Sequence, residues 1–290
     1  MEGDNFVDSI SKQAHHTRMA KSRTIAQRLT PSSIIKPSEL IDIEELAPLT
    51  LTDRRIFNLL LANAWDAIDQ DVEHSIRKRE LRGTTKDTKR LDENIGRLQA
   101  ARIKLLVKRD DNKKYRRSFG LLQRVDEGVT QDGLIYYKFD PDLRNVISQS
   151  TVFARLQKDI LLQLSSKYSL VLYEMIQRRV NLTHKWSDVF TIEELRTLLT
   201  VPKGKLTVYK NLKGYALKPA IEEVNGLADF GVGFKEIKKG KKVVAVEIAW
   251  HRKNMDELKL AYAERSRHRV GRRARLSKKV DALFIPSSLK

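Results

Sequence analysis

Residues 209–250 have the sequence YKNLKGYALKPAIEEVNGLADFGVGFKEIKKGKKVVAVEIAW. The stretch predicts a helix that ends near Asn225-Gly226, because glycine freely adopts the left-handed conformation that closes helices. A β-hairpin follows, with alternating side chains in its second strand and a tight turn at Lys239-Gly240. Four lysines surround this turn: Lys238, Lys239, Lys241 and Lys242. A basic helix beside a lysine-tipped hairpin is typical of a winged-helix domain, whose helix enters a DNA groove while its wing reaches the neighbouring backbone.

The charge of the whole chain favours the same class of partner. The sequence has 56 Lys and Arg against 37 Asp and Glu, which gives a formal net charge of +19. Such an excess favours a polyanionic partner, most often nucleic acid. The alternative is a basic protein that is simply soluble or associated with ribosomes. Hydrophobic residues make up 41% of the 290 residues, which is enough for two modest cores.

What the sequence lacks excludes several classes of protein. It has no cysteine, which excludes disulfides, iron–sulfur clusters, thiol catalysis and cysteine zinc sites. The first residues, MEGDNFVDSISKQ, lack the basic start and apolar core of a signal peptide. No apolar run approaches the roughly 18–20 residues that span a bilayer. We therefore expect a cytoplasmic protein with no membrane contact.

The first half of the chain predicts one unit of helices followed by a hairpin. Residues 49–68 predict a helix with Thr52 as its cap, and a second helix is expected near residues 87–104. Phe119–Val125 and Leu134–Phe139 are predicted to be paired strands, because the segment between them contains glycines that suit a turn.

The same pattern then repeats. Asp159–Val180 predicts a helix rich in buried residue types, and Thr191 with Glu194 predicts a capping box at the start of a short helix. The helix and hairpin of residues 209–250 complete this second unit. We therefore predict an α+β fold with two tandem winged-helix domains, a flexible N-terminal arm and a basic C-terminal tail. The predicted boundaries are 1–46 for the arm, 47–152 and 153–254 for the two domains, and 255–290 for the tail.

The tail prediction depends on composition. Residues 251–290 contain twelve Lys and Arg but four Asp and Glu, and we expect no packed core from such a segment. Its arginines predict either a nonspecific DNA-binding arm or a tail that binds a partner. Ending the chain at Glu264 is accordingly expected to change the stability of the domains very little.

Four motifs resemble one known family. They are LSSKYSLVLYEMI at 164–176, FTIEELRTLLTV at 190–201, LKPAIEEVN at 217–225 and EIKKGKKV at 236–243. Their order and spacing are similar to those of the second domain in theta-type plasmid replication initiators, the winged-helix Rep family that binds iterons. A weaker likeness in the first domain extends the resemblance over about residues 49–250.

The resemblance implies a function and partners. It implies that monomers bind the double-stranded DNA of directly repeated origin sites through both domains, and that the second domain makes the main base contacts. It also implies homodimers, formed through the first domain, that repress the initiator's own promoter. Host initiation proteins and the replicative helicase would follow as partners. The alternative is a tandem winged-helix transcriptional regulator without initiation activity.

The predicted DNA-binding residues lie on the second recognition helix, its wing and the tail. The resemblance places that helix at Tyr209–Asn225, and Pro219 within it predicts a bent or late-starting helix. A solvated face is the alternative for the helix lysines, whereas the wing lysines are expected to contact phosphate. The full set is Lys205, Tyr209, Lys210, Lys213, Lys218, Lys238, Lys239, Lys241, Lys242, Arg272 and Arg273.

The sequence favours a protein without catalytic activity, cofactor or metal. Tyr168 and Tyr173 lie on an apolar helix without a nearby histidine or acid pair, so a nucleophile is not expected there. His15 and His16 are adjacent, which does not fit the metal site of a rolling-circle initiator. Gly231 lacks the spacing of a phosphate-binding loop. A DNA-processing enzyme is therefore the least favoured class.

Overall fold

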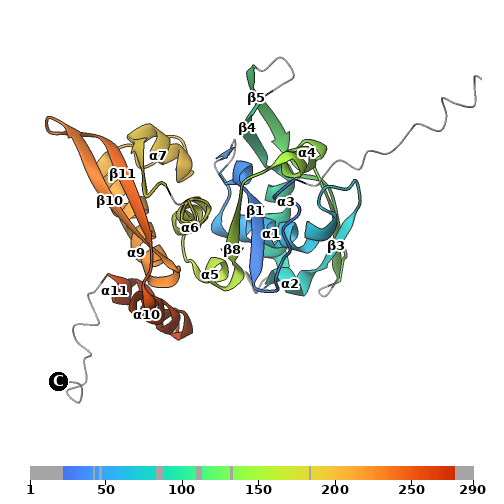
Figure 1. Ribbon diagram of the computed structural model, residues 1–290. Helices are drawn as coiled ribbons and strands as arrows, with labels where there is room; N and C mark the ends of the chain where they lie inside the picture. The colour runs from blue at the N-terminus through green and yellow to red at the C-terminus, as the bar shows by residue number, and fades with distance from the viewer. Residues whose placement is uncertain are drawn as a thin grey trace, which may run out of the picture.

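The computed structural model describes residues 22–41, 43–45, 48–82, 88–108, 113–130, 133–182 and 184–277. These residues form two lobes with helix α6 (Lys167–Arg179) between them (Figure 1). Half of the predicted arm, which includes His15 and His16, and the end of the predicted tail lie outside the described residues.

The first lobe contains three small antiparallel sheets, with strand orders β2-β4-β5, β3-β7-β6 and β1-β8. Its elements are β1 (Ser33–Pro37), η1 (Ser38–Leu40), β2 (Glu44–Glu45), α1 (Leu51–Ala64), η2 (Trp65–Ala67), β3 (His74–Arg77), α2 (Lys78–Arg82), α3 (Thr88–Ala100), β4 (Arg102–Lys108), β5 (Lys114–Gly120), β6 (Leu122–Glu127), β7 (Leu134–Phe139), α4 (Pro141–Gln149), β8 (Phe153–Gln157) and α5 (Lys158–Gln163).

Helix α1 is the centre of the first lobe. The predicted helix is confirmed, but its cap is Thr50 rather than Thr52, because only Thr50 stands three residues before Asp53 and forms a capping box with it. The Asp53 carboxylate also accepts two hydrogen bonds from Arg97, at 3.0 and 3.1 Å, and thereby ties α1 to α3. The hydroxyl of the buried Tyr137 on β7 donates to the Leu60 carbonyl of α1.

The strands of the first lobe differ from the prediction in one respect. The pairing of the segments near 119–125 and 134–139 is confirmed by the β6–β7 ladder. However, the first segment divides between β5 and β6, because the Gly120 amide donates to the Asp140 carboxylate and the chain turns before β6 begins. Strand β5 instead pairs with β4, which begins where the predicted second helix was expected to continue.

Part of the predicted N-terminal arm belongs to the fold, so the boundary at residue 46 is wrong. Strand β1 pairs with β8 from Ser33↔Gln157 to Pro37↔Phe153, and Ile34 and Ile35 are fully buried. The same pairing joins β8, predicted as the start of the second domain, to the first lobe. The physical reason is long-range pairing, which local composition does not reveal.

A buried ion pair fastens β1 to α6. The Lys36 ammonium lies 2.8 Å from Glu174, and Asn58 of α1 donates to the same carboxylate at 2.8 Å. Burial lowers the pKa of Lys36, an effect that Glu174 opposes. Because a buried ion needs a partner, this contact joins β1, α1 and α6 in a defined arrangement.

The second lobe has the arrangement expected of a winged helix. Its sheet has the order β10-β11-β9, and α6 packs against α9. The elements after α6 are β9 (Ser187–Thr191), α7 (Ile192–Leu198), α8 (Tyr209–Leu212), the π-turn η3 (Lys213–Leu217), α9 (Lys218–Leu227), β10 (Phe230–Lys239), β11 (Lys242–Arg252), α10 (Met255–Ser266) and α11 (Arg272–Leu276).

Local signals correctly located most of this lobe. The predicted capping box of Thr191 and Glu194 is present at α7. The predicted single helix at 159–180 is instead two, α5 and α6, because Ser166 caps a new helix by accepting from the Ser169 amide. In the core, the Tyr173 ring of α6 stacks on Phe230 of β10, with the ring centroids 5.8 Å apart.

The described part of the predicted basic tail, up to Ser277, forms helices α10 and α11, which corrects the boundary near residue 254. Helices α10 and α11 both pack on α9. Leu276 lies so close over Gly226 that any side chain at that position would collide with it. The arginines become part of the packed structure because Glu264 and Asp229 supply opposite charges. A composition-based expectation cannot account for such pairs.

Candidate nucleic-acid interface

The predicted recognition helix is one continuous helical segment from Tyr209 to Leu227, built from α8, η3 and α9. Pro219 does not interrupt this segment, and the α-helical part that contains it begins late, at Lys218. Pro219 occupies one of the first two positions of α9, directly after the π-turn. A proline has no N–H to donate, and a π-turn is a known way for a helix to accommodate a change in its hydrogen-bond ladder.

One face of this segment is free for a ligand. Leu212, Leu217 and Val224 are fully buried against the lobe. The opposite face exposes Lys210, Asn211, Gly214, Tyr215 and Lys218. The sequence did not single out Asn211, although an exposed amide on such a helix can form two hydrogen bonds, with N6 and N7 of one adenine, in the major groove.

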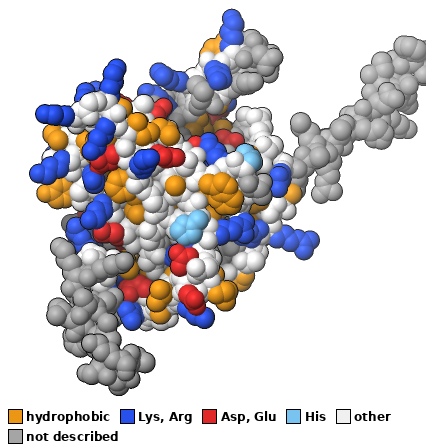
Figure 2. Space-filling model, turned by 60° about the vertical axis from the view of Figure 1, so that its left-hand side comes forward, with side chains coloured by type: hydrophobic (Ala, Val, Ile, Leu, Met, Phe, Trp, Pro, Cys, Tyr) orange, Lys and Arg blue, Asp and Glu red, His pale blue; other side chains and the backbone are white. Residues whose placement is uncertain are grey.

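The wing is the hairpin of β10 and β11, which extends beyond α7 in Figure 1. Its strands pair up to Lys239↔Lys242, and Gly240 in the turn has a φ of 62°, a conformation that favours glycine. The four predicted wing lysines are exposed: Lys238, Lys239, Lys241 and Lys242. Figure 2 shows Lys and Arg side chains along the upper part of this side of the molecule.

Two predicted residues of the helix contact the wing strand instead of standing free. The Tyr209 hydroxyl donates to Glu236 of β10 at 3.0 Å, and the Lys213 ammonium donates to the same oxygen at 2.8 Å. The Lys213 Nζ also lies 5.6 Å from the centre of the Phe234 ring. Lys210 and Lys218 remain on the free face, so the structure separates the predicted helix residues into two groups.

The charges in this cluster influence one another. The hydrogen bond from Lys213 is the main cause that holds the pKa of Glu236 below its usual value, with Tyr209 acting in the same direction. Burial raises the pKa of Tyr209, and the neighbouring Glu236 raises it further. The carboxylate is therefore charged, and the phenol neutral, at any pH near neutrality.

The loop before the helix presents Lys205, which is exposed. The Arg196 guanidinium of α7 holds this loop by donating to the carbonyls of Lys205 and Leu206. Leu206 has a φ of 46°, in the left-handed region that is costly for a residue other than glycine. Arg196 is thus a supporting residue that the sequence analysis did not identify.

The two predicted tail residues have different positions. The Arg272 guanidinium is buried and donates to Glu264 at 3.1 Å and to the Gln163 side chain at 2.8 Å. In this structure Arg272 is therefore not available to DNA, which corrects the prediction. Its neighbour Arg273 is exposed.

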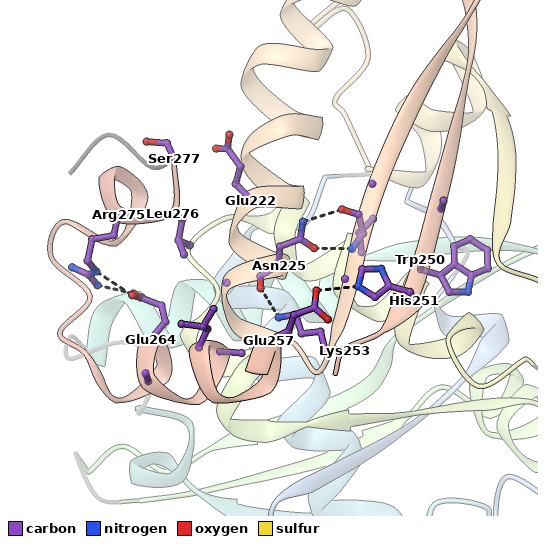
Figure 3. Close-up of a pocket in the computed structure, with 18 of the residues that line it drawn as sticks. Glu222, Asn225, Trp250, His251, Lys253, Glu257, Glu264, Arg275, Leu276 and Ser277 are labelled. Carbon is purple, nitrogen blue, oxygen red and sulfur yellow. Dashed lines mark hydrogen bonds and ion pairs between the residues drawn. The ribbon is translucent and has the colours of Figure 1, made fainter. Parts of the chain in front are cut away.

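A pocket of about 950 Å³ lies between α9, the base of the wing and α10–α11, and Figure 3 shows the residues that line it. Asn225 closes one wall by exchanging two hydrogen bonds with the Val232 backbone, at 2.9 and 2.7 Å. Arg275 and Glu264 close another. No predicted DNA-binding residue lines this pocket, so we assign its polar contacts to packing of the C-terminal helices.

The first lobe carries a second basic hairpin, which the sequence analysis missed. Strands β4 and β5 project from the lobe in Figure 1. Arg102, Lys114 and Arg116 on these strands are exposed. The strands have few apolar residues on their outer face, which explains why no alternating pattern revealed β5.

The arrangement of two winged helices agrees with comparisons to known proteins. Residues 33–177 match the family model described as "Initiator Replication protein, WH1", and residues 191–250 match "Initiator Rep protein, WH2". The chain belongs to the initiator replication protein family. The resemblance inferred from the sequence motifs is thus confirmed, as are the two winged-helix domains.

A solved structure has the same fold as this initiator. It is described as "Crystal structure of Pi initiator protein in complex with iteron DNA", with a TM-score of 0.59 and 20% sequence identity. The similarity covers 78% of the present chain and 100% of the other. No curated protein sequence matches the initiator. Helices α10 and α11 lie beyond both residue ranges matched by the family models.

The described part of the initiator has neither a metal-binding cluster nor a membrane-spanning helix. No group of three or more His, Asp or Glu side chains within it is placed to hold a metal ion. Among the helices that the structure describes, none has both the length and the apolar character needed to cross a membrane.

Proposed function

We propose that this initiator binds directly repeated double-stranded sites, or iterons, at a plasmid origin and promotes origin opening and loading of the host helicase. One observation carries the proposal: the free face of α8–α9 lies beside a wing tipped with exposed lysines. The initiator family, together with the similar Pi initiator structure in complex with iteron DNA, supports iterons as the ligand.

The free face and the wing have different roles in this proposal. Lys210 and Asn211 are placed to meet base edges when α8–α9 enters the major groove, because both side chains are exposed at its leading end. The wing lysines contact phosphates, which supply affinity but carry no sequence information. The basic β4–β5 hairpin of the first lobe gives a second phosphate contact along the same duplex.

Binding at several adjacent repeats provides the free energy needed to open the origin. Bending or straining an A·T-rich segment costs a few kcal/mol, which additional contacts can repay. We further propose that the protein acts in the cytoplasm, that dimers repress its own promoter, and that host initiation proteins join the complex. A transcriptional regulator without initiation activity is the less favoured alternative, given the initiator family.

We also propose that initiation here involves no covalent chemistry by the protein. Tyr173 is fully buried, and its hydroxyl accepts a hydrogen bond from the Gln157 amide at 2.9 Å. Such a phenol has no access to a phosphodiester. Supercoiled DNA incubated with the protein and Mg²⁺ is expected to show no nick and no adduct that survives denaturant.

The decisive experiment compares two duplexes by fluorescence anisotropy at several salt concentrations. One duplex carries the direct repeats adjacent to the gene, and the other carries the same bases in scrambled order. We expect much tighter binding to the repeats, and permanganate reactivity in the neighbouring A·T-rich segment only when repeats are present. Equal affinity for both duplexes at moderate salt would contradict sequence-specific binding.

A further inference from the structure

Glu236 occupies an unusual position for an acidic residue, because it lies between the recognition helix and the lysine-rich wing. Its partner in the ladder is Val246, and the preceding residue on the same face, Phe234, pairs with Ile248. Val246 and Ile248 are fully buried. Since opposed residues in an antiparallel ladder point to the same face, Glu236 faces the helix.

The Glu236 carboxylate contacts both the recognition helix and the wing. One of its oxygens accepts from Tyr209 at 3.0 Å and from Lys213 at 2.8 Å. The other lies 3.9 Å from the Lys238 ammonium of the wing. The Glu236 side chain is 21% exposed and Lys213 is 41% exposed, so the pair is in reach of a bound DNA backbone.

Packing alone does not account for an acid at this position. The helix-facing side of β10 is apolar at Val232 and Phe234 before it reaches Glu236. An apolar residue would continue that packing without desolvating a charge. The acid also reduces the positive charge of a surface that otherwise attracts phosphate.

We infer that Glu236 is a specificity-determining residue, which restrains Lys213 from phosphate and weakens binding to DNA that does not engage the free face of α8–α9. The inference rests on the proposed function. On a random duplex, Lys213 contributes little and the carboxylate repels the backbone. On a cognate repeat, base contacts by the free face hold α8–α9 in one register, in which Lys213 on the wing side of the helix does not face a phosphate, so freeing Lys213 adds little affinity there. The ratio of specific to nonspecific affinity is therefore larger with Glu236 than without it.

The test uses Glu236→Gln, which keeps the side-chain shape and removes the charge. The matched control is Glu80→Gln, which removes the same charge from an exposed side chain on α2 in the first lobe. For random duplex we expect Glu236→Gln to bind about 3–10-fold tighter, with a log–log salt slope steeper by about 0.9 because one further phosphate is contacted. The affinity ratio of repeats to random duplex is expected to fall, whereas Glu80→Gln leaves both quantities unchanged.

A double-mutant cycle separates the restraint of Lys213 from a general change in charge. Lys213→Met is expected to alter random-duplex binding little in the native background and to abolish the gain in the Glu236→Gln background. Tyr209→Phe, which removes a hydrogen bond but no charge, should leave the salt slope unchanged. Circular dichroism of each variant establishes that the helices are retained.

Two results would overturn the inference. One is an unchanged salt slope and affinity ratio in Glu236→Gln. The other is an equal effect of Lys213→Met in both backgrounds, which would show that Lys213 contacts phosphate despite Glu236. If the native protein showed no preference for repeats, the proposed function would fail. The measurements on random duplex would still decide whether Glu236 restrains Lys213.

Discussion

The wing tip and the C-terminal arginine segment are both strongly basic, yet the structure uses them in opposite ways. At the wing tip, Lys239, Lys241 and Lys242 are exposed and have no ion-pair partner among the described residues. In the C-terminal segment, Arg272 is buried and Arg265 has a side chain only 6% exposed. Similar local charge therefore indicates a ligand surface in one place and a packed structural element in the other.

The difference comes from what surrounds each segment. A hairpin tip has no neighbouring element to supply countercharge. The arginines lie beside α9 and the end of α5, where they meet Glu264, Asp229 and backbone carbonyls. A guanidinium has five donors in a planar fork and can satisfy several acceptors at once. Arginine is consequently suited to bury its charge here, whereas the tip lysines stay hydrated.

The largest expected effect is on stability when the chain ends at Glu264. This truncation removes the hydrogen bonds of Arg265, Arg272 and Arg275 and the packing of Leu276 on α9. Each hydrogen bond that involves a charged group contributes about 1.5–3 kcal/mol, so the free energy of unfolding in urea should fall by about 3–5 kcal/mol. The control ends at Ser277 and keeps every described contact. Equal stability of both truncations would show that the segment behaves as a simple tail, as its composition suggests.

Adjacent arginines allow a finer comparison. Arg272→Met removes hydrogen bonds to Glu264 and Gln163, and we expect a loss of about 1.5–3 kcal/mol because each bond involves a charged group. The loss stays below that of the truncation since Arg275 still pairs with Glu264. Arg273→Met, at the exposed neighbour, should change the free energy of unfolding by less than about 0.5 kcal/mol. Thermal and urea unfolding of the two variants measure the difference in stability between them. Equal losses of stability would contradict the assigned burial of Arg272.

The wing should show the reverse behaviour. Lys239→Ala with Lys241→Ala is expected to weaken binding to repeats and random duplex alike, and to reduce the log–log salt slope by about 0.9 for each phosphate that the variant no longer neutralises. Unfolding should be unchanged because neither side chain packs on the lobe. Lys259→Ala on α10, 72% exposed and far from the tip in Figure 1, is the control for charge alone. A wing variant that lost only repeat binding would mean that the wing reads bases.

The smallest effect concerns acid pH. Burial tends to raise the pKa of Glu264, but hydrogen bonds from Arg275 and Arg272 outweigh it and leave the pKa below the ordinary 4.5. Because the folded pKa is depressed, this stabilisation is complete above about pH 4.5 and is lost as the pH falls through the folded value. The difference in unfolding free energy between the native protein and Glu264→Gln should therefore shrink below pH 4.5. A difference that stays constant from pH 6 to pH 3 would exclude the predicted pKa shift.

Sequence patterns predicted the elements of the second winged helix because the signals there are local. Thr191 and Glu194 form a capping box within one turn, and Gly240 closes a two-residue hairpin loop. The exposed wing lysines and most of the recognition helix likewise follow from neighbouring residues. The predicted end of that helix at Asn225-Gly226 is wrong, because Gly226 does not have a left-handed conformation and the helix continues to Leu227. The family motifs added the ligand class, which charge alone left open between nucleic acid and other polyanions.

Contacts between residues far apart in the sequence decided the rest. Four contacts join segments that local composition treats separately. They are the pairing of β1 with β8, the Lys36–Glu174 ion pair, the hydrogen bond from Arg272 to Gln163 and the Lys213–Glu236 contact. Whether a lysine or arginine is free or bound depends on the countercharge that the fold brings beside it, and burial then multiplies the strength of that pairing. Sequence by itself therefore determined the wing, most of the helices of the second winged helix and the distribution of positive charge. Only the tertiary structure decided which of those charges remain free to meet DNA.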